Sequence, residues 1–440
     1  MSFVPHTPEE IRTMLERIGA GDVGDLFEDV PQSLRSNAKL DLPPALGEQE
    51  LLSYIESQAS RNVPASSVAS FLGAGAYHHF IPAAVDSLAS RGEFSTAYTP
   101  YQAEISQGTL QAIFEFQSMV CQLTGLEVAN ASLYDGASAV AETALMAMRA
   151  TRRSRICASA GLHPRYLDVL RTYTRGLGAE IEILPLGDDG RTRPVEPAGD
   201  AAALLIQSPN FFGCVERTRG FAEAAHGAGA LLAGVVSEPL SLALLRPPGE
   251  QGADIACGEV QSFGLPLSFG GPYAGFMATR QELVRQLPGR LIGQTRDADG
   301  RRGFVMTLTA REQHIRRQRA TSNICTNQGL CALRVAIYLA LVGRQGLRRL
   351  ARDCFSLARY ARQRLASAGL RLPYAAPVFN EFVVEVPDLD DRLERCAERG
   401  IRPGVPLRDF DPARADQLLV CVTEMNPRAQ IDALVEALAA

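Results

Sequence analysis

Short apolar runs alternate with helical patterns across the middle of this chain. The apolar runs lie at residues 154–158, 180–186, 202–207, 230–236, 254–257 and 275–278. Helical patterns at residues 165–176 and 218–227 separate some of these runs. Alternation of this kind predicts a mostly parallel sheet with helices on both faces. Ligands of such sheets bind at the carboxyl ends of the strands, so we expect a site in the loops there.

The two ends of the chain carry different patterns. Thr7 to Glu10 form a capping box, which predicts a short helix ahead of a proline-rich connector. This arm, residues 1–65, is expected to dock on its own domain or on a partner. Residues 331–440 begin with a long helical pattern and continue with strand-like pieces and a terminal helix. We therefore predict an arm, a large α/β domain over residues 66–330 and a small C-terminal α+β domain.

Composition excludes several classes of protein. The net charge of -5 gives no reason to expect a nucleic-acid partner. The nine cysteines are dispersed without a CxxC pair, which favours free thiols in a reducing compartment. The first residues lack the features of a signal peptide, and no apolar run approaches a membrane span. We expect a soluble cytoplasmic protein without a membrane association.

The basic residues limit the covalent chemistry of the chain. Of its 44 lysine and arginine residues, only Lys39 is a lysine. Arginine stays protonated and cannot act as an amine nucleophile. Any mechanism that needs a lysine Schiff base therefore has one candidate, and Lys39 lies in the arm, where a solvated side chain is expected.

Residues 92–142 contain the first candidate site. A polar aromatic loop at residues 98–102 precedes a helical pattern that ends near Gly125. A second loop, at residues 130–138, leads into an alanine-rich helix. Backbone N–H groups at such a helix start can surround an anion, usually phosphate. An ordinary N-cap with a tight turn explains the same residues, and both interpretations stay open.

Two further stretches carry candidate polar residues. Arginines crowd around His314 within residues 303–329. A solvated helix face explains this segment, and so does a surface that faces an anion or a partner. His78 and His79 are adjacent and point in different directions in any regular element. No third ligand lies near them in the sequence, so we predict no metal site.

Three motifs together resemble one family. Residues 98–108 (YTPYQAEISQG), 130–136 (NASLYDG) and 311–325 (REQHIRRQRATSNIC) are similar to the glycine cleavage system P-protein, a glycine dehydrogenase (decarboxylating). The length resembles subunit 1, the half-length chain of a P-protein that is split in two. The resemblance implies the type I fold of pyridoxal-phosphate (PLP) enzymes, with an arm, a large seven-stranded domain and a small domain. It also implies PLP-dependent decarboxylation of glycine, with transfer of the aminomethyl group to the lipoyl arm of H-protein.

This chain departs from the type I pattern at the cofactor. Residues 258–264, where the resemblance places the Schiff-base lysine, contain none. Val235 stands about where an aspartate would pair with the pyridinium nitrogen. Asp135, Gly136, Ala137 and Ser138 keep the form of the phosphate-binding loop, and His163 lies about where a residue would stack on the ring. These residues predict a vestigial pocket, with no catalytic residue and no cofactor in this chain.

We therefore expect a pair with a homologous subunit 2 that carries lysine and PLP, acting on glycine and lipoylated H-protein. The residues expected to complete the active site of that partner are Tyr98, Thr99, Tyr101, Gln102, Arg311, His314 and Asn323. Their expected role is to position the carboxylate of glycine or the lipoyl arm. The alternative is a structural or regulatory pseudoenzyme that stabilises subunit 2 without touching its chemistry. A self-sufficient PLP enzyme that uses Lys39 is the third and least favoured possibility.

Overall fold

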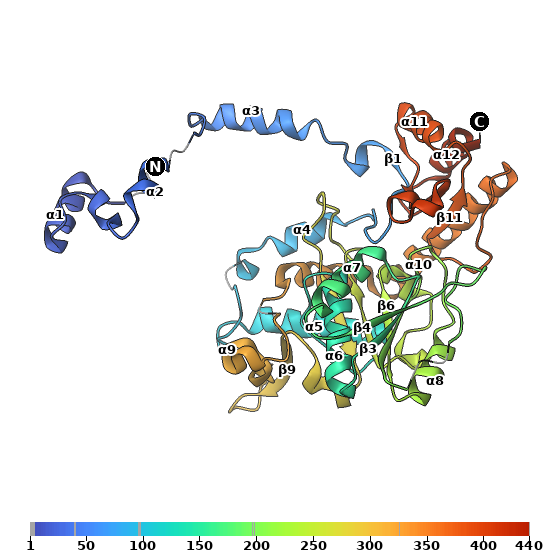
Figure 1. The fold of residues 1–440 in the computed structure, drawn as a ribbon, viewed down its shortest axis with the longest axis horizontal. Helices are drawn as coiled ribbons and strands as arrows, with labels where there is room; N and C mark the ends of the chain where they lie inside the picture. The colour runs from blue at the N-terminus through green and yellow to red at the C-terminus, as the bar shows by residue number, and fades with distance from the viewer. Residues whose placement is uncertain are drawn as a thin grey trace. The chain divides into compact units, whose positions relative to one another are not determined.

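The computed structural model describes residues 5–38, 41–95, 98–195, 197, 199–324 and 326–439. The predicted roles of Lys39 and Cys325 therefore lie outside the described residues. The chain divides into two compact units, one up to Val63 and one from Pro64 onward (Figure 1). The predicted boundary between a large and a small domain at residue 330 lies within the second unit and stays a prediction.

The described residues of the first unit contain three α-helices, α1 (Pro8–Ile18), α2 (Gln32–Asn37) and α3 (Glu48–Ala59). The predicted capping box is present, because the Thr7 hydroxyl accepts from the Glu10 N–H and the Thr7 N–H donates to the Glu10 carboxylate. Gly19 ends α1 in the left-handed conformation. Among the described residues of this unit only Leu15 is buried. The apolar side chains of the described part of the unit therefore form no core.

The second unit is built around a seven-stranded sheet. Its strand order is β2-β8-β7-β6-β5-β3-β4, as follows: β2 (Val128–Ala129), β3 (Arg155–Ser159), β4 (Glu180–Leu184), β5 (Ala201–Gln207), β6 (Leu231–Val236), β7 (Ile255–Glu259) and β8 (Gly275–Thr279). Strands β4, β3, β5, β6 and β7 run parallel, while β8 is antiparallel to both β7 and β2. This confirms the predicted parallel sheet. It also places the carboxyl ends of five strands at one edge.

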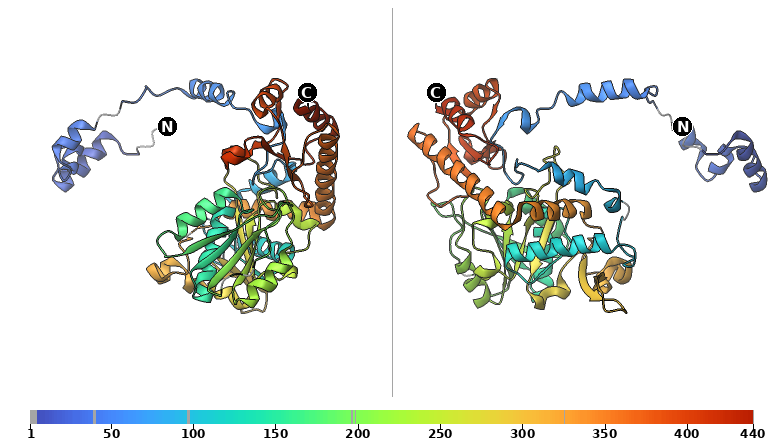
Figure 2. Two further views of the ribbon diagram at one scale, coloured as in Figure 1. Left: turned by 45° about the vertical axis from the view of Figure 1, so that its right-hand side comes forward. Right: turned by 180° about the vertical axis from the view of Figure 1, so that it is seen from behind.

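Helices cover both faces of this sheet, as successive buried residues of each strand point to opposite sides. On one face α6 (Gly136–Thr151) and α7 (Pro164–Thr174) pack against residues such as Leu205, Val235 and Cys257. On the other, α5 (Gln107–Thr124) and the first half of α10 (Gly329–Ser367) form one core and α8 (Thr218–Gly227) another. The right-hand view of Figure 2 shows α4 (Ala83–Ala89), α5 and α10 beside one another.

The C-terminal part has its own small sheet and core. Strands β11 (Glu381–Glu385), β14 (Gln417–Cys421) and β13 (Val405–Pro406) form an antiparallel sheet covered by α11 (Leu389–Glu398), α12 (Arg428–Ala439) and the second half of α10. Strand β1 (Ala69–Ser70) pairs with β12 (Ile401–Arg402). A hairpin of β9 (Leu291–Arg296) and β10 (Arg302–Thr307) lies beside α5, and the short helix α9 (Gln313–Arg316) follows it.

Helix α10 is long and apolar enough to cross a membrane by length and composition alone. Gly343 has non-helical backbone angles and interrupts the helix. The buried residues of α10 up to Cys354 belong to one core of the second unit, and those from Ala358 onward belong to the core of the small sheet. This packing is typical of a helix that belongs to a protein core. The eight cysteines among the described residues are all free, as their spacing predicts.

Candidate functional site

The predicted anion loop forms the N-terminus of α6. The Asp135 carboxylate caps the helix by accepting from the Ser138 N–H at 2.7 Å. The N–H of Gly136 donates to Oε2 of Glu259 at 2.9 Å. Because Glu259 belongs to this same chain, a side chain already occupies the anion-binding end of the helix.

Glu259 reaches this position from the carboxyl end of β7. It lies on the same side of the strand as Ile255 and Cys257, the side that faces α6. Its Oε1 accepts from the N–H groups of Val260 and Ala274, each at 3.0 Å. Burial raises the pKa of Glu259 to about 8, and the three N–H donors oppose that rise. Both oxygens are therefore used inside the protein.

A tyrosine closes the space beside this carboxylate. A Cβ added at Gly136 would lie 2.4 Å from the hydroxyl oxygen of Tyr166, so only glycine fits there. Tyr166 also stacks on the ring of His163, with centroids 4.8 Å apart and planes inclined by 21°. The Nε2–H of His163 donates to the Ala74 carbonyl at 2.9 Å, and burial lowers the pKa of this histidine. Both the His163 ring and its nitrogen already have partners.

Val235 completes the region as an apolar residue. It is 1% exposed and belongs to the core between the sheet and α6. The structure thus brings the predicted pocket residues to one edge of the sheet. Glu259 and Tyr166 lie against the start of α6 at this edge, and we call this region the filled pocket. Sequence reasoning missed these two residues, and the signal for Glu259 was an acidic residue at the end of a buried strand.

The second predicted set of residues lies on the surface. Tyr98 is 88% exposed and Tyr101 is 58% exposed, while Gln102 and Asn323 are exposed as well. The Tyr101 ring lies 6.3 Å from the half-exposed ring of His314, in an edge-on arrangement. The loop at residues 98–102 and the segment at residues 311–324 and 326–327 therefore lie side by side. We call these two stretches the edge cluster.

A buried arginine supports the edge cluster from below. The guanidinium of Arg290 lies 5.7 Å from the centroid of Tyr101, and Arg290 is 5% exposed. Its Nε lies 4.0 Å from Oε2 of Glu312, and its Nη1 donates to Asn327 at 3.4 Å. Oε1 of Glu312 has no hydrogen-bond partner among the described residues. The cluster thus combines aromatic rings with cationic groups.

Two predicted residues of the edge cluster are less accessible than the others. Arg311 donates to the carbonyls of Leu308 at 3.0 Å and Gly289 at 3.1 Å, and also to that of Leu287. Burial lowers the pKa of Arg311, and these bonds hold the segment in place. The hydroxyl of Thr99 is buried and has no hydrogen-bond partner among the described residues. These positions favour a supporting role, and contact of either residue with a partner stays a prediction.

Comparisons with known proteins agree with this architecture. A family model described as "Glycine cleavage system P-protein" matches residues 1–438. A "Probable glycine dehydrogenase (decarboxylating) subunit 1" from Desulforamulus reducens is 48% identical over 445 residues, covering 100% of both chains. A protein of the same name from Thermomicrobium roseum is 51% identical over 446 residues, covering 100% of this chain and 99% of its own.

Solved structures give the same result. A crystal structure of glycine decarboxylase (P-protein) of the glycine cleavage system, in inhibitor-bound form, is 47% identical with a TM-score of 0.92, covering 100% of this chain and 99% of the other. A sphingosine-1-phosphate lyase from Burkholderia pseudomallei is 16% identical, covers 93% of both chains and has a TM-score of 0.64, which shows the fold alone. The predicted type I fold and the predicted family are confirmed. The chain belongs to the glycine cleavage system P-protein family.

Proposed function

We propose that this chain is subunit 1 of a glycine dehydrogenase (decarboxylating) and completes an active site that a homologous subunit 2 carries. Relatives of that name cover 100% of this chain, which supports the role of a subunit. The observation that carries the proposal is the edge cluster. It gathers exposed aromatic and cationic side chains on the surface, whereas the pocket of this chain is filled.

The residues of this pocket do not fit PLP. Residues 258–264 offer no lysine for a Schiff base, and Val235 cannot hold a pyridinium nitrogen protonated. The Gly136 N–H, which a phosphate would need, is bonded to Glu259. Tyr166 already stacks on one face of the His163 ring. We therefore assign no PLP to this chain and no step of the reaction to its pocket.

The edge cluster suits the recognition of an anion or a flexible arm presented by another chain. Arg290 lies beside Glu312 and the Tyr101 ring, and its Nη1 donates to Asn327, while its Nε has no hydrogen-bond partner among the described residues. Tyr98 extends beyond it into solvent. Arg290 is buried and supports Tyr101, so the exposed side chains around it are the ones that would position a carboxylate such as that of glycine. The exposed rings offer apolar surface to a lipoyl arm of H-protein.

When bound in subunit 2, PLP supplies the electron sink for the loss of CO2 from glycine. The side chains of this chain orient the substrate and shield it from water, and none of them is placed to carry a proton for the reaction. The proposed site lies at the junction of the two subunits. The assignment is the same for an assembly of one pair of subunits and for an assembly of two pairs. A cytoplasmic location stays a prediction.

The test compares subunit 2 alone with the reconstituted pair. Both samples contain the same concentration of folded, PLP-loaded subunit 2. We expect glycine–bicarbonate exchange only in the sample that also contains this chain. The PLP absorbance and the far-UV circular dichroism of subunit 2 report that its concentration is the same in both samples. Full exchange by subunit 2 alone would contradict the proposal and leave the stabilising pseudoenzyme in its place.

A further inference from the structure

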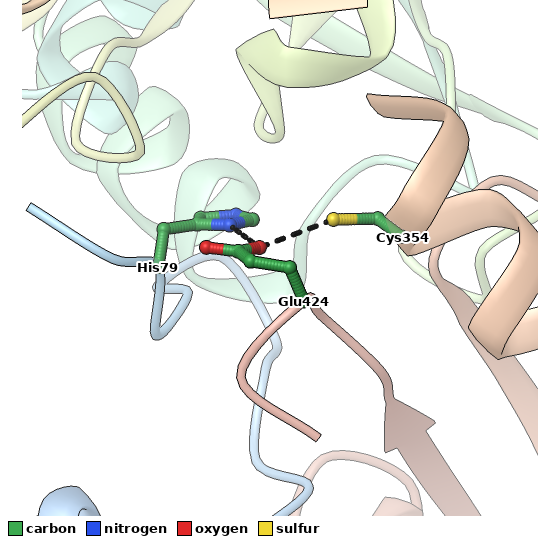
Figure 3. Close-up of side chains that lie close together, drawn as sticks. All are labelled: His79, Cys354 and Glu424. Atoms are coloured by element: carbon green, nitrogen blue, oxygen red, sulfur yellow. Dashed lines mark hydrogen bonds and ion pairs between the residues drawn. The ribbon is translucent and has the colours of Figure 1, made fainter. Parts of the chain in front are cut away.

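A second group of ionisable side chains lies apart from the filled pocket and from the edge cluster. His79 belongs to the irregular segment after β1, Cys354 to the second half of α10, and Glu424 to the loop after β14. Figure 3 shows the three side chains converging on one point from these separate parts of the chain. All three belong to the second unit.

The ligand atoms of these residues are as close as metal ligands. Nδ1 of His79 lies 2.8 Å from Oε2 of Glu424, and Sγ of Cys354 lies 3.2 Å from the same oxygen. All three atoms lie within 4.8 Å of one another. Zinc bonds of about 2.0–2.3 Å in a tetrahedron place ligand atoms about 3.5 Å apart. Small side-chain movements would therefore admit a zinc ion between them.

A fourth residue orients the histidine as in known zinc sites. Nε2 of His79 lies 3.1 Å from Oε2 of the buried Glu238. Glu238 is held in turn, because the Leu240 N–H donates to its Oε1 at 2.9 Å. A carboxylate that accepts the Nε2–H of a histidine leaves Nδ1 as the ligand atom and fixes the ring. This outer contact distinguishes the group from a chance cluster of polar side chains.

We propose that His79, Cys354 and Glu424 bind a zinc ion, with Glu238 as the outer carboxylate on His79. A mixture of nitrogen, sulfur and oxygen ligands suits a borderline metal such as zinc, whereas calcium and magnesium take oxygen ligands. Without the metal, Nδ1–H of His79 donates to Glu424 and the Cys354 thiol keeps its proton. Binding of the metal releases both protons, and a water molecule fills the fourth position from the side of Glu424.

The site would link three parts of the molecule. The metal would tie the segment after β1, and the half of α10 that follows Gly343, to the end of the small sheet. Its expected role is to fix the small sheet against the large one. This inference does not depend on the proposed role in glycine decarboxylation, because none of these residues belongs to the edge cluster or to the filled pocket.

The experiment uses the full chain without an affinity tag, stripped with a chelator and then titrated with zinc and, separately, with cobalt. We expect about one zinc per chain after gel filtration, and a thiolate-to-cobalt charge-transfer band in the near ultraviolet. Cys354→Ser should remove the band. Cys396→Ser, which changes another buried free thiol, in α11, should keep it.

A second variant tests the site with a substitution that is less apt to cause misfolding. Glu424→Gln keeps the shape of the side chain, and we expect it to weaken zinc binding at least about tenfold. Circular dichroism reports whether each variant is folded. Folded wild-type chain that retains no zinc and shows no cobalt band would overturn the proposal. So would a Cys354→Ser or Glu424→Gln variant that is folded and binds zinc as tightly as the wild type.

Discussion

The filled pocket and the edge cluster differ in how their polar groups are satisfied. In the pocket, both oxygens of Glu259 and both nitrogens of His163 have partners within this chain. In the edge cluster, Tyr98 and Tyr101 are exposed, and Glu312 keeps an oxygen without a hydrogen-bond partner among the described residues. Buried polar groups without partners are costly, so proteins retain them mainly where another molecule uses them. This difference agrees with the proposal that the pocket of this chain is vestigial and that the edge cluster serves a partner.

The largest effect is expected from opening the pocket. Glu259→Ala leaves the N–H groups of Gly136, Val260 and Ala274 without an acceptor in a buried place. We expect a loss of about 4 kcal/mol in the free energy of unfolding, from unpaired donors and from the cavity. Urea unfolding of the isolated chain measures this loss. A change below about 1 kcal/mol would show that Glu259 does not hold the pocket closed.

Removal of the two exposed tyrosine side chains of the edge cluster should reduce activity without reducing stability. For Tyr98→Ala with Tyr101→Ala we expect glycine–bicarbonate exchange of the reconstituted pair to fall about 100-fold, because a misplaced substrate loses alignment. Tyr173→Ala changes a partly exposed tyrosine on α7 and serves as the control. Gel filtration confirms that the pair still forms. Normal exchange in an assembled pair would contradict the completion of the partner's site.

The dependence of stability on pH reports on two buried glutamates, Glu259 in the pocket and Glu381 on β11. Burial raises the pKa of Glu259 to about 8 and that of Glu381 to about 7, against 4.5 for an ordinary glutamate. Between pH 4.5 and the raised pKa values, the folded chain binds more protons than the unfolded chain. Their contribution to stability is therefore complete below pH 4.5 and is lost as the pH rises through 7 and 8.

Glu259→Gln should remove part of this dependence. We expect the stability of the wild type to fall by about 2 kcal/mol more than that of the variant between pH 5 and pH 7. Urea unfolding at a series of pH values measures the difference. Equal slopes for the two proteins would mean that Glu259 is ionised throughout and that its N–H donors outweigh its burial.

The smallest effect concerns the support beneath the edge cluster. Arg290→Lys keeps the charge but loses the planar contact with Tyr101 and part of the contact with Glu312. We expect exchange to fall about threefold, in line with a cation–π contribution of about 0.5–1 kcal/mol. Arg302→Lys changes a similar contact, with Phe304, and should leave exchange unchanged. Equal effects of both substitutions would remove Arg290 from the site.

Much of the fold follows from the periodicity of the sequence. The predicted helix at 218–227 coincides with α8, and six strands of the large sheet lie within one or two residues of their predicted places, whereas the two-residue strand β2 was not predicted. The resemblance of motifs located the pocket and the edge cluster. What the sequence did not reveal is how side chains meet. His79 showed no third ligand nearby because Cys354 and Glu424 lie about 275 and 345 residues further along the chain.

The same limit explains why the closure of the pocket was not foreseen. The missing lysine and Val235 predicted a chain without cofactor, but they did not predict that its space is filled. Glu259 and Tyr166 lie close together because β7 ends, and α7 begins, at the carboxyl edge of the sheet. Contacts of this kind depend on packing between elements, which no local pattern encodes.

The content of PLP tests the central claim most directly. The isolated chain, incubated with excess PLP and freed of unbound cofactor, should show no aldimine absorbance and no pyridoxyl-lysine after borohydride reduction. The reconstituted pair should carry one PLP for each pair of chains, attached to subunit 2. A pyridoxyl group on this chain, with absorbance lost on Lys39→Ala, would contradict the account.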